Sequence, residues 1–193
     1  INYKRRFIIM NLTKLPTNLI KTKFDDSCDY LLNMTIPEIL LPTQDNNLLK
    51  LNRLDTFRLI IFFYSMTGHP DRPLPDNWNS IPGASGCTSQ ICSYRDNYDE
   101  LIKNNCIPIG VCTQSVKEIK EMTVRLKVPF DVLSDQNLNL TSKIKLPTFS
   151  VGNRTYIKRI TLLIERSVIK KFFYPVFPAD KNIYKVLKWL ENN

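Results

Sequence analysis

The chain has 193 residues, and 43% of them are hydrophobic, which is enough to bury the core of one domain. Its 27 Lys and Arg residues exceed its 18 Asp and Glu residues and give a net charge of +9, but the two signs are interleaved rather than gathered in a basic stretch. We therefore predict no nucleic-acid partner, and the lack of any apolar run of about eighteen residues predicts no membrane span.

Cysteine and histidine usage narrows the chemistry further. The five cysteines stand at positions 28, 87, 92, 106 and 112. An odd number in this spacing does not fit a secreted disulfide framework, and the first ten residues do not resemble a signal peptide, so we expect a reducing, cytoplasmic location. The single histidine, His69, lies in a Gly-His-Pro turn, which argues against a Cys/His zinc site and against a Ser-His-Asp triad.

The N-terminal part of the chain is expected to lead into a central strand. We predict a basic tail over residues 1–14 and a single domain over residues 15–193. Residues 15–41 are rich in turn-forming residues and predict an irregular lead-in. Leu48 to Leu51 can form a short strand. Phe57 to Tyr64 is a continuous apolar run, which is typical of a strand buried on both faces of a sheet.

Ser65 to Ser80 follows this strand as an inserted loop, because its turn-formers exclude helix and strand alike. These turn-formers are Gly68, Pro70, Pro73, Pro75 and Asn77. Trp78 and Ile81 are apolar and can anchor the loop to the body of the domain. Simple anchoring and a lid over the next helix are both open interpretations.

The next helix is predicted to begin at Cys87. Pro82, Gly83 and Gly86 loosen the backbone before it, and Ser85 or Gly86 can cap it. Its apolar side is predicted from residues at helical spacing: Ile91, Tyr94, Tyr98, Leu101 and Ile102. A thiol at this end meets the positive end of the helix dipole, which favours an anion by only ~0.3–1 kcal/mol. A free thiol is only ~3% ionised at neutral pH, so a nucleophilic sulfur here requires a nearby cation as well.

The second half of the chain continues the alternation of strands and helices. Residues 106–112 predict a buried strand with a cysteine at each end. This position favours a role for Cys106 and Cys112 as core thiols rather than as metal ligands. Ser115 and Glu118 form a capping box that opens a further helix. The apolar side of this helix consists of Ile119, Met122 and Leu126.

The remaining elements complete a sheet. Val128 to Leu133 predicts a short strand or an extended segment. Residues 160–165 and 168–173 predict a hairpin across Arg166 and Ser167. Asp180 is predicted to cap a final helix. The order β-α-β-α-β-β-α predicts an α/β, thioredoxin-like fold with a central mixed sheet flanked by helices on both faces.

Three motifs in this order resemble those of Q-type peroxiredoxins, also called bacterioferritin comigratory proteins. They are Gly86-Cys87-Thr88-x-x-x-Cys92-x-x-Arg95-Asp96, the preceding strand Phe62-Phe63-Tyr64, and Pro129-Phe130-Asp131-Val132-Leu133-Ser134-Asp135. The resemblance covers roughly Asp26 to Leu190. It implies that Cys87 is the peroxidatic cysteine, that Cys92 is the resolving cysteine, and that an arginine from a later strand lies beside the sulfur of Cys87.

Arg159 matches that arginine better than Arg154, because it precedes the Ile-Thr-Leu strand. The chain departs from the family's Pro-x-x-x-Thr-x-x-Cys pattern, since Ser80 and Ala84 stand at the proline and threonine places. An insertion before Cys87 accounts for the shift and matches a subgroup of the family. The hydroxyls that can replace the missing threonine are those of Thr67, Ser85 and Thr88, and the sequence does not choose among them.

The resemblance implies a thiol-dependent peroxidase that reduces hydrogen peroxide and organic hydroperoxides. Cys87 would form a sulfenic acid and then a disulfide with Cys92, and thioredoxin or another dithiol would reduce that disulfide. No metal or organic cofactor is expected, and the protein is expected to be a monomer or a homodimer. Taken alone, Cys92 beside Ile91 resembles a core thiol, and only the context of Cys87 favours the resolving role.

Two alternatives stay open at this point. Leu146-Pro147-Thr148-Phe149 resembles the proline loop that faces the redox pair of a thioredoxin-like disulfide reductase, although the chain lacks Cys-x-x-Cys. The second alternative is a non-catalytic redox-sensing protein on the same fold, which the missing threonine favours.

Overall fold

The computed structural model describes residue 20, residues 28–53 and residues 58–193. The predicted basic tail, residues 1–14, lies outside the described residues, and the single domain over residues 15–193 stays a prediction. None of the helices in the described part of the chain is long and apolar enough to cross a membrane.

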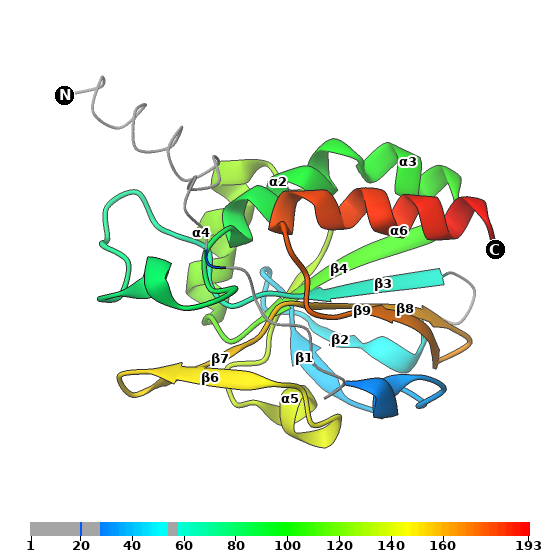
Figure 1. The fold of residues 1–193 in the computed structure, drawn as a ribbon, viewed down its shortest axis with the longest axis horizontal. Coiled ribbons are helices and arrows are strands. Elements are labelled where there is room, and N and C mark those ends of the chain that lie inside the picture. The colour runs from blue at the N-terminus through cyan, green and yellow to red at the C-terminus, as the bar shows by residue number, and fades with distance from the viewer. Residues whose placement is uncertain (1–19, 21–27, 54–57) are drawn as a thin grey trace.

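A five-stranded mixed sheet forms the centre of the structure, in the order β5-β4-β3-β8-β9 (Figure 1). Its strands are β3 (Arg58–Phe63), β4 (Cys106–Cys112), β5 (Val132–Ser134), β8 (Ile160–Glu165) and β9 (Val168–Phe173). Strands β3, β4 and β5 run parallel, whereas β8 is antiparallel to both β3 and β9. The predicted central strand is confirmed, because β3 lies in the middle of the sheet.

Successive side chains of β3 point to opposite faces of the sheet, so the core has two layers. Ile60 and Phe62 pack under the helices, while Ile61 and Phe63 pack on the opposite face. The helices of the first layer are α2 (Cys87–Asp96), α3 (Tyr98–Lys103), α4 (Val116–Leu126) and α6 (Asn182–Glu191). Right-handed crossovers from β3 to β4 and from β4 to β5 place α2, α3 and α4 on the same face.

The opposite face is covered by shorter elements (Figure 1). They are η1 (Asp29–Leu31), α5 (Asn139–Lys143), the hairpin of β1 (Leu40–Pro42) and β2 (Leu48–Lys50), and the hairpin of β6 (Thr148–Val151) and β7 (Arg154–Ile157). Three further 3-10 turns connect elements, namely η2 (Leu51–Arg53), η3 (Trp78–Ser80) and η4 (Ala179–Lys181). The predicted α/β, thioredoxin-like fold with helices on both faces is confirmed.

Several local predictions were wrong. The lead-in predicted over residues 15–41 ends in a strand, since β1 starts at Leu40 and pairs with β2. Helix α5 and the β6–β7 hairpin were not expected, and the loop predicted over 65–80 ends in a 3-10 turn at Trp78. Of the strand or extended segment predicted over Val128 to Leu133, the strand part begins at Val132.

Two predictions about helix ends were also wrong. The helix that begins at Cys87 is interrupted at Asn97, whose backbone is non-helical, and Ile102 beyond the break is 42% exposed. Asp180 does not cap the last helix. It lies inside η4, and α6 begins at Asn182 without a side-chain cap.

The insertion between β3 and α2 is held by aromatic packing. Trp78 is buried, with its ring centroid 4.9 Å from that of Tyr156 and 5.8 Å from that of Phe149. Ile81 packs against the same cluster. The anchoring interpretation of the loop is therefore confirmed, whereas nothing in these contacts tests a lid.

The capping box at the start of α4 is confirmed. The Ser115 hydroxyl accepts a hydrogen bond from the backbone N–H of Glu118, and the Glu118 carboxylate accepts from the backbone N–H of Ser115. Burial opposes ionisation of Glu118, but hydrogen bonds from Ser115 and Arg154 outweigh it and lower the pKa of the carboxyl. The predicted apolar side of this helix is also buried.

Replacing Ser115 with alanine should lower the free energy of unfolding by about 1 kcal/mol, because it leaves an N–H group at the start of α4 unsatisfied. Urea denaturation followed by circular dichroism measures the change. Ser142→Ala in α5 is the matched control, since Ser142 is exposed, and it should leave the midpoint nearly unchanged. Equal effects of the two substitutions would contradict the role of the cap.

Candidate active site

The backbone before α2 forms a tight turn that presents successive carbonyl oxygens to one place. Gly83 and Gly86 have φ values of 79° and 100°, a region that side chains other than glycine rarely adopt. Gly86 is the N-cap of α2 and contributes no side-chain cap. Cys87 is therefore the first residue of the helix, as predicted, and its sulfur lies where the helix dipole is positive.

The sulfur of Cys87 has two polar neighbours and is shielded from solvent. The residue is 2% exposed. Its thiol donates to the carbonyl oxygen of Ala84 at 3.4 Å, and Nη2 of Arg159 donates to its sulfur at 3.1 Å. Arg159 immediately precedes β8 and is 3% exposed. The structure thus places Arg159 beside Cys87, as the sequence predicted.

Three further hydrogen bonds fix the Arg159 guanidinium. Its Nη1 donates to the Gly83 carbonyl at 2.9 Å, its Nη2 donates to the Ser85 carbonyl at 3.1 Å, and its Nε donates to Oε1 of Gln90 at 2.8 Å. All three acceptors are neutral. Among the described residues no carboxylate forms an ion pair with Arg159. The buried guanidinium therefore presents its positive charge to the sulfur of Cys87, 3.1 Å away.

Gln90 is a site residue that the sequence analysis missed. It lies one turn after Cys87 in α2 and is fully buried. Its amide nitrogen donates to Oδ1 of Asn182 at 3.4 Å, and that oxygen also accepts from the hydroxyls of Tyr94 and Thr161, each at 2.7 Å. The signal was a polar residue three positions after a cysteine, on the buried face of an amphipathic helix.

Arg154, the alternative that the sequence analysis rejected, lies elsewhere. It begins β7, its side chain is 63% exposed, and it forms an ion pair with Glu118 at 3.3 Å.

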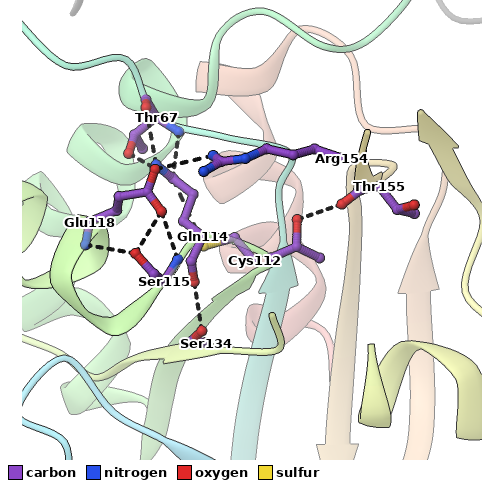
Figure 2. A network of polar contacts seen from close by, with 9 residues as sticks. Thr67, Cys112, Gln114, Ser115, Glu118, Ser134, Arg154 and Thr155 are labelled. Carbon is purple, nitrogen blue, oxygen red and sulfur yellow. Dashed lines mark hydrogen bonds and ion pairs between the residues drawn. The ribbon is translucent and has the colours of Figure 1, made fainter. Parts of the chain in front are cut away.

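Figure 2 shows Arg154 within a polar network at the ends of β4 and β5. Gln114 accepts from the backbone N–H and the hydroxyl of Thr67 at 2.9 and 3.0 Å, and its carbonyl accepts from Ser134 at 2.6 Å. This network ties the insertion to the sheet.

Two of the three hydroxyls that could replace the motif threonine form hydrogen bonds elsewhere. The Thr67 hydroxyl donates to Gln114, and the Ser85 hydroxyl donates to Asn79 at 2.6 Å. Thr88 is buried in the first turn of α2. None of the three forms a hydrogen bond to the Cys87 sulfur in the described part of the chain. The backbone carbonyl of Ala84 is the acceptor found there instead.

Cys92 lies in the same helix, 8% exposed, with its thiol free. Burial raises the pKa of this thiol above its ordinary value, against a smaller opposing effect of Arg95. Burial also raises the pKa of Cys106 to about 11 and that of Cys112 to about 12. The three thiols therefore stay protonated near neutral pH, and Cys106 and Cys112 behave as core residues, as predicted.

Comparison with known proteins agrees with this geometry. Residues 79–171 match the AhpC/TSA family, a stretch that begins within η3 and ends within β9. Over these residues the chain is similar to the AhpC/TSA family. Its relatives include peroxiredoxin Bcp of Escherichia coli (strain K12), which is 26% identical over 160 residues, covering 81% of this chain and 93% of that protein. The predicted resemblance to Q-type peroxiredoxins is confirmed at the level of the family and its relatives.

Plant relatives and solved structures extend the comparison. The chloroplastic peroxiredoxin Q of Oryza sativa subsp. japonica is 25% identical over 81% of this chain, which spans only 64% of the length of that protein. Peroxidoxin BcpB from Mycobacterium tuberculosis has a TM-score of 0.69 at 20% identity, covering 83% of this chain and 96% of that one. Peroxiredoxin Q of Xanthomonas campestris has a TM-score of 0.64 at 18% identity, covering 92% and 99%. The AhpC/TSA fold is therefore shared across most of the chain.

Cys92 should react slowly with iodoacetamide in the reduced, folded protein at neutral pH. Its pKa is raised, so its thiolate is scarce at neutral pH and becomes more abundant as the pH rises. Mass spectrometry of a Cys87→Ser variant, at several pH values, measures labelling of Cys92 without interference from the other site. Urea-unfolded protein provides the control rate. Labelling at the same rate in folded and unfolded protein would contradict the burial of this thiol.

Proposed function

We propose that this chain is a thiol-dependent peroxidase in which Cys87 reduces hydrogen peroxide and organic hydroperoxides. The contact that carries the proposal is the 3.1 Å hydrogen bond from the buried Arg159 guanidinium to the Cys87 sulfur. Attraction between a guanidinium and a thiolate at this distance is about 5 kcal/mol at an effective dielectric of ~20, before desolvation is subtracted. The helix dipole adds at most ~1 kcal/mol, so the arginine is the dominant influence.

The first step is a displacement at oxygen. The thiolate of Cys87 attacks the terminal oxygen of the peroxide, an S–O bond forms, and the O–O bond breaks. The leaving oxygen takes up a proton and departs as water or an alcohol. Arg159 has a planar fork of donors and can stabilise the negative charge that develops on that oxygen. The sulfur is left as a sulfenic acid, and no metal or organic cofactor is needed.

The second step forms a disulfide with Cys92. The sulfur of Cys92 attacks the sulfenic sulfur of Cys87, and the hydroxyl leaves as water. Residues five apart in a helix have Cα atoms ~8–9 Å apart on faces ~140° apart, whereas a disulfide needs less than ~7 Å. The first turns of α2 must therefore unwind, a local opening that costs less than global unfolding.

An external dithiol then reduces the disulfide by thiol exchange and is itself oxidised. The relatives named peroxiredoxin support a thiol reductant. Thioredoxin or a similar dithiol in that role, and a reducing, cytoplasmic compartment, are part of the proposal. A monomer or a homodimer, without a nucleic-acid or membrane partner, is part of the same proposal.

Substitution of the two cysteines tests the reaction. Reduced Cys87→Ser should consume no peroxide, because the attacking sulfur is missing. Cys92→Ser should consume one equivalent of peroxide at the rate of the unchanged chain and then stop turning over with a dithiol reductant. Peroxide consumption in single- and multiple-turnover assays measures both. Continued turnover by Cys92→Ser would refute its resolving role, and consumption by Cys87→Ser would refute the proposed reaction.

Arg159→Lys tests the arginine separately. Lysine keeps the charge but loses the fork that contacts Gln90, Gly83 and the sulfur, so the rate of the first peroxide step should fall about 10²–10³-fold. Stopped-flow single-turnover kinetics measure this rate. Arg154→Lys is the matched control and should change it less than about twofold, since Arg154 is exposed at a distant pair. Equal rates for the two variants would remove Arg159 from the reaction.

A further inference from the structure

The thiol of Cys92 is buried at the place where the proposed second step needs a thiolate. Cys92 lies in the second half of α2 and is 8% exposed. A thiol must lose its proton to act as a nucleophile, and burial opposes that loss. Charged groups that favour the thiolate of Cys92 therefore bear directly on the second step.

Arg95 is the first of two cations near this thiol. It follows Cys92 by three residues in α2, so the two side chains are neighbours on the helix surface. Its Nη1 donates to the carbonyl oxygen of Leu126 at 2.8 Å, and its Nη2 lies 2.7 Å from Oδ1 of Asp96. Leu126 ends α4 and belongs to the same apolar cluster as Cys92. The turn of α2 that carries Cys92 therefore lies against the last turn of α4, on the same face of the sheet (Figure 1).

Arg125, in that last turn of α4, is the second cation. Its side chain is 13% exposed. Its Nε and Nη2 donate to the carboxylate of Glu121 at 2.6 and 3.3 Å, and Nη2 also donates to the carbonyl oxygen of Gly68 at 3.0 Å. Its Nη1 is buried and has no hydrogen-bond partner in the described part of the chain. The guanidinium is therefore held in the last turn of α4, next to the turn of α2 that carries Cys92.

The influences on the Cys92 thiol oppose one another. Burial is the largest and raises the pKa of the thiol, Arg95 and Arg125 lower it, and Asp96 raises it. These charged groups come from α2 itself and from the adjacent α4. Burial outweighs the arginines in the folded chain, so the thiol stays protonated near neutral pH. The cost of burial depends on the exclusion of water, whereas the effect of the arginines depends on their positions.

Unwinding of the first turns of α2 changes the first influence and leaves the second. The part of α2 that follows Cys92 has its own attachments. Ser93 donates to the carbonyl oxygen of Asp180 at 2.7 Å, and Arg95 donates to Leu126. Neither contact involves the first turn, so Cys92 stays beside both cations when that turn opens. Water then reaches the sulfur, the cost of burial falls, and the balance moves toward the thiolate.

We infer that Arg95 and Arg125 are positioning residues for the resolving step, whose charges favour the Cys92 thiolate once α2 has opened. The inference rests on the proposed function, since it concerns the second step of that reaction. In the closed helix Cys92 is protonated and protected. In the open helix it gives its proton to solvent and attacks the sulfenic sulfur of Cys87, so that the S–S bond forms as the S–O bond breaks. The hydroxide that leaves takes up a proton and becomes water, and the arginines exchange neither protons nor electrons.

The pH dependence of Cys92 alkylation by iodoacetamide, in a reduced Cys87→Ser background, tests the charges without peroxide. Asp96→Asn should lower the apparent pKa of the Cys92 thiol by at least about 0.3 unit, which makes alkylation about twofold faster below that pKa. Asp99→Asn is the matched control. It removes the same charge from an exposed residue of α3 that does not act on Cys92, and it should leave the profile unchanged.

Substitutions of the Arg125–Glu121 pair separate charge from structure. Arg125→Gln should raise the apparent pKa of Cys92 by at least about 0.3 unit, and Arg125→Lys, which keeps the charge, should restore most of the change. Glu121→Gln leaves Arg125 without its anion and should shift the pKa in the opposite direction. A merely structural role would shift both variants the same way, because each loses the same contact.

Two results would overturn the effect of the charges on Cys92. One is a shift of the same sign in Arg125→Gln and Glu121→Gln. The other is an equal profile for Asp96→Asn and Asp99→Asn, two exposed substitutions that keep the test valid if an Arg125 variant does not fold.

The rate of disulfide formation after one equivalent of hydrogen peroxide tests the link to the reaction. Arg95→Gln combined with Arg125→Gln should slow formation of the Cys87–Cys92 disulfide at least about fivefold near neutral pH, and a higher pH should restore part of the rate. Arg154→Gln, at a distant exposed pair, is the matched control and should not change it. Rapid quenching and mass spectrometry measure the disulfide.

The same experiment distinguishes the two ways in which the inference can fail. Equal rates of disulfide formation in the double variant and in Arg154→Gln would overturn the inference while the proposed peroxidase stands. A chain that consumes no peroxide would overturn the proposed function, and the alkylation profiles would still decide whether the arginines favour the Cys92 thiolate.

Discussion

The hydrogen bond between Arg159 and the Cys87 sulfur depends on the register of the central sheet. Phe63 pairs with Ile160 at the end of the antiparallel β3–β8 ladder, so Arg159 lies just beyond the point where β3 ends. The chain leaves β3 there, forms the insertion, and returns as the turn before α2. A shift of one residue in this register would send the guanidinium to the opposite face of the sheet. Cys87 and Arg159 are 72 positions apart in the sequence, and strand pairing brings them together. The apolar core that fixes this pairing therefore also fixes the position of the guanidinium beside the sulfur.

The turn before α2 surrounds the Cys87 sulfur and the Arg159 guanidinium with backbone carbonyls. The carbonyls of Gly83 and Ser85 accept from Arg159, while the carbonyl between them, that of Ala84, accepts from the thiol. Their convergence requires positive φ values at Gly83 and Gly86. The Ala84 carbonyl and the Arg159 guanidinium favour opposite protonation states of the sulfur. The Ala84 carbonyl can accept only from the protonated thiol, whereas attraction to Arg159 is strongest when the proton is lost.

The sequence predicted those elements whose local pattern and tertiary role agree. Continuous apolar runs predicted strand β4 and the β8–β9 hairpin, and the bounds of these strands are confirmed. A two-residue side-chain motif predicted the capping box of α4, which is also confirmed. Residues 139–157 lack such patterns, because α5 and the β6–β7 hairpin are short and acquire stability from packing against the sheet. Asp180 was a reasonable cap by residue type, but the chain tightens into η4 at that point. In the site, helix position predicted Cys87 and the resemblance indicated Arg159. Gln90 was missed because its one signal, a polar residue on the buried face of the helix, does not say what the side chain contacts.

Helix α2 is held at both ends, and the two attachments differ in their dependence on the sulfur. At the far end, Ser93 donates to the carbonyl of Asp180 at 2.7 Å and Tyr94 donates to Asn182, contacts that do not change when Cys87 reacts. At the near end, Arg159 donates both to the sulfur of Cys87 and to the side chain of Gln90, and only the first of these bonds depends on the state of the sulfur. In the proposed reaction the thiolate becomes a neutral sulfenic acid, so the bond to the sulfur loses its ionic partner while the bond to Gln90 stays. Under that proposal, oxidation removes one of the contacts that hold the first turn of α2, the part that must unwind for Cys87 to reach Cys92, and leaves the contacts at the far end in place.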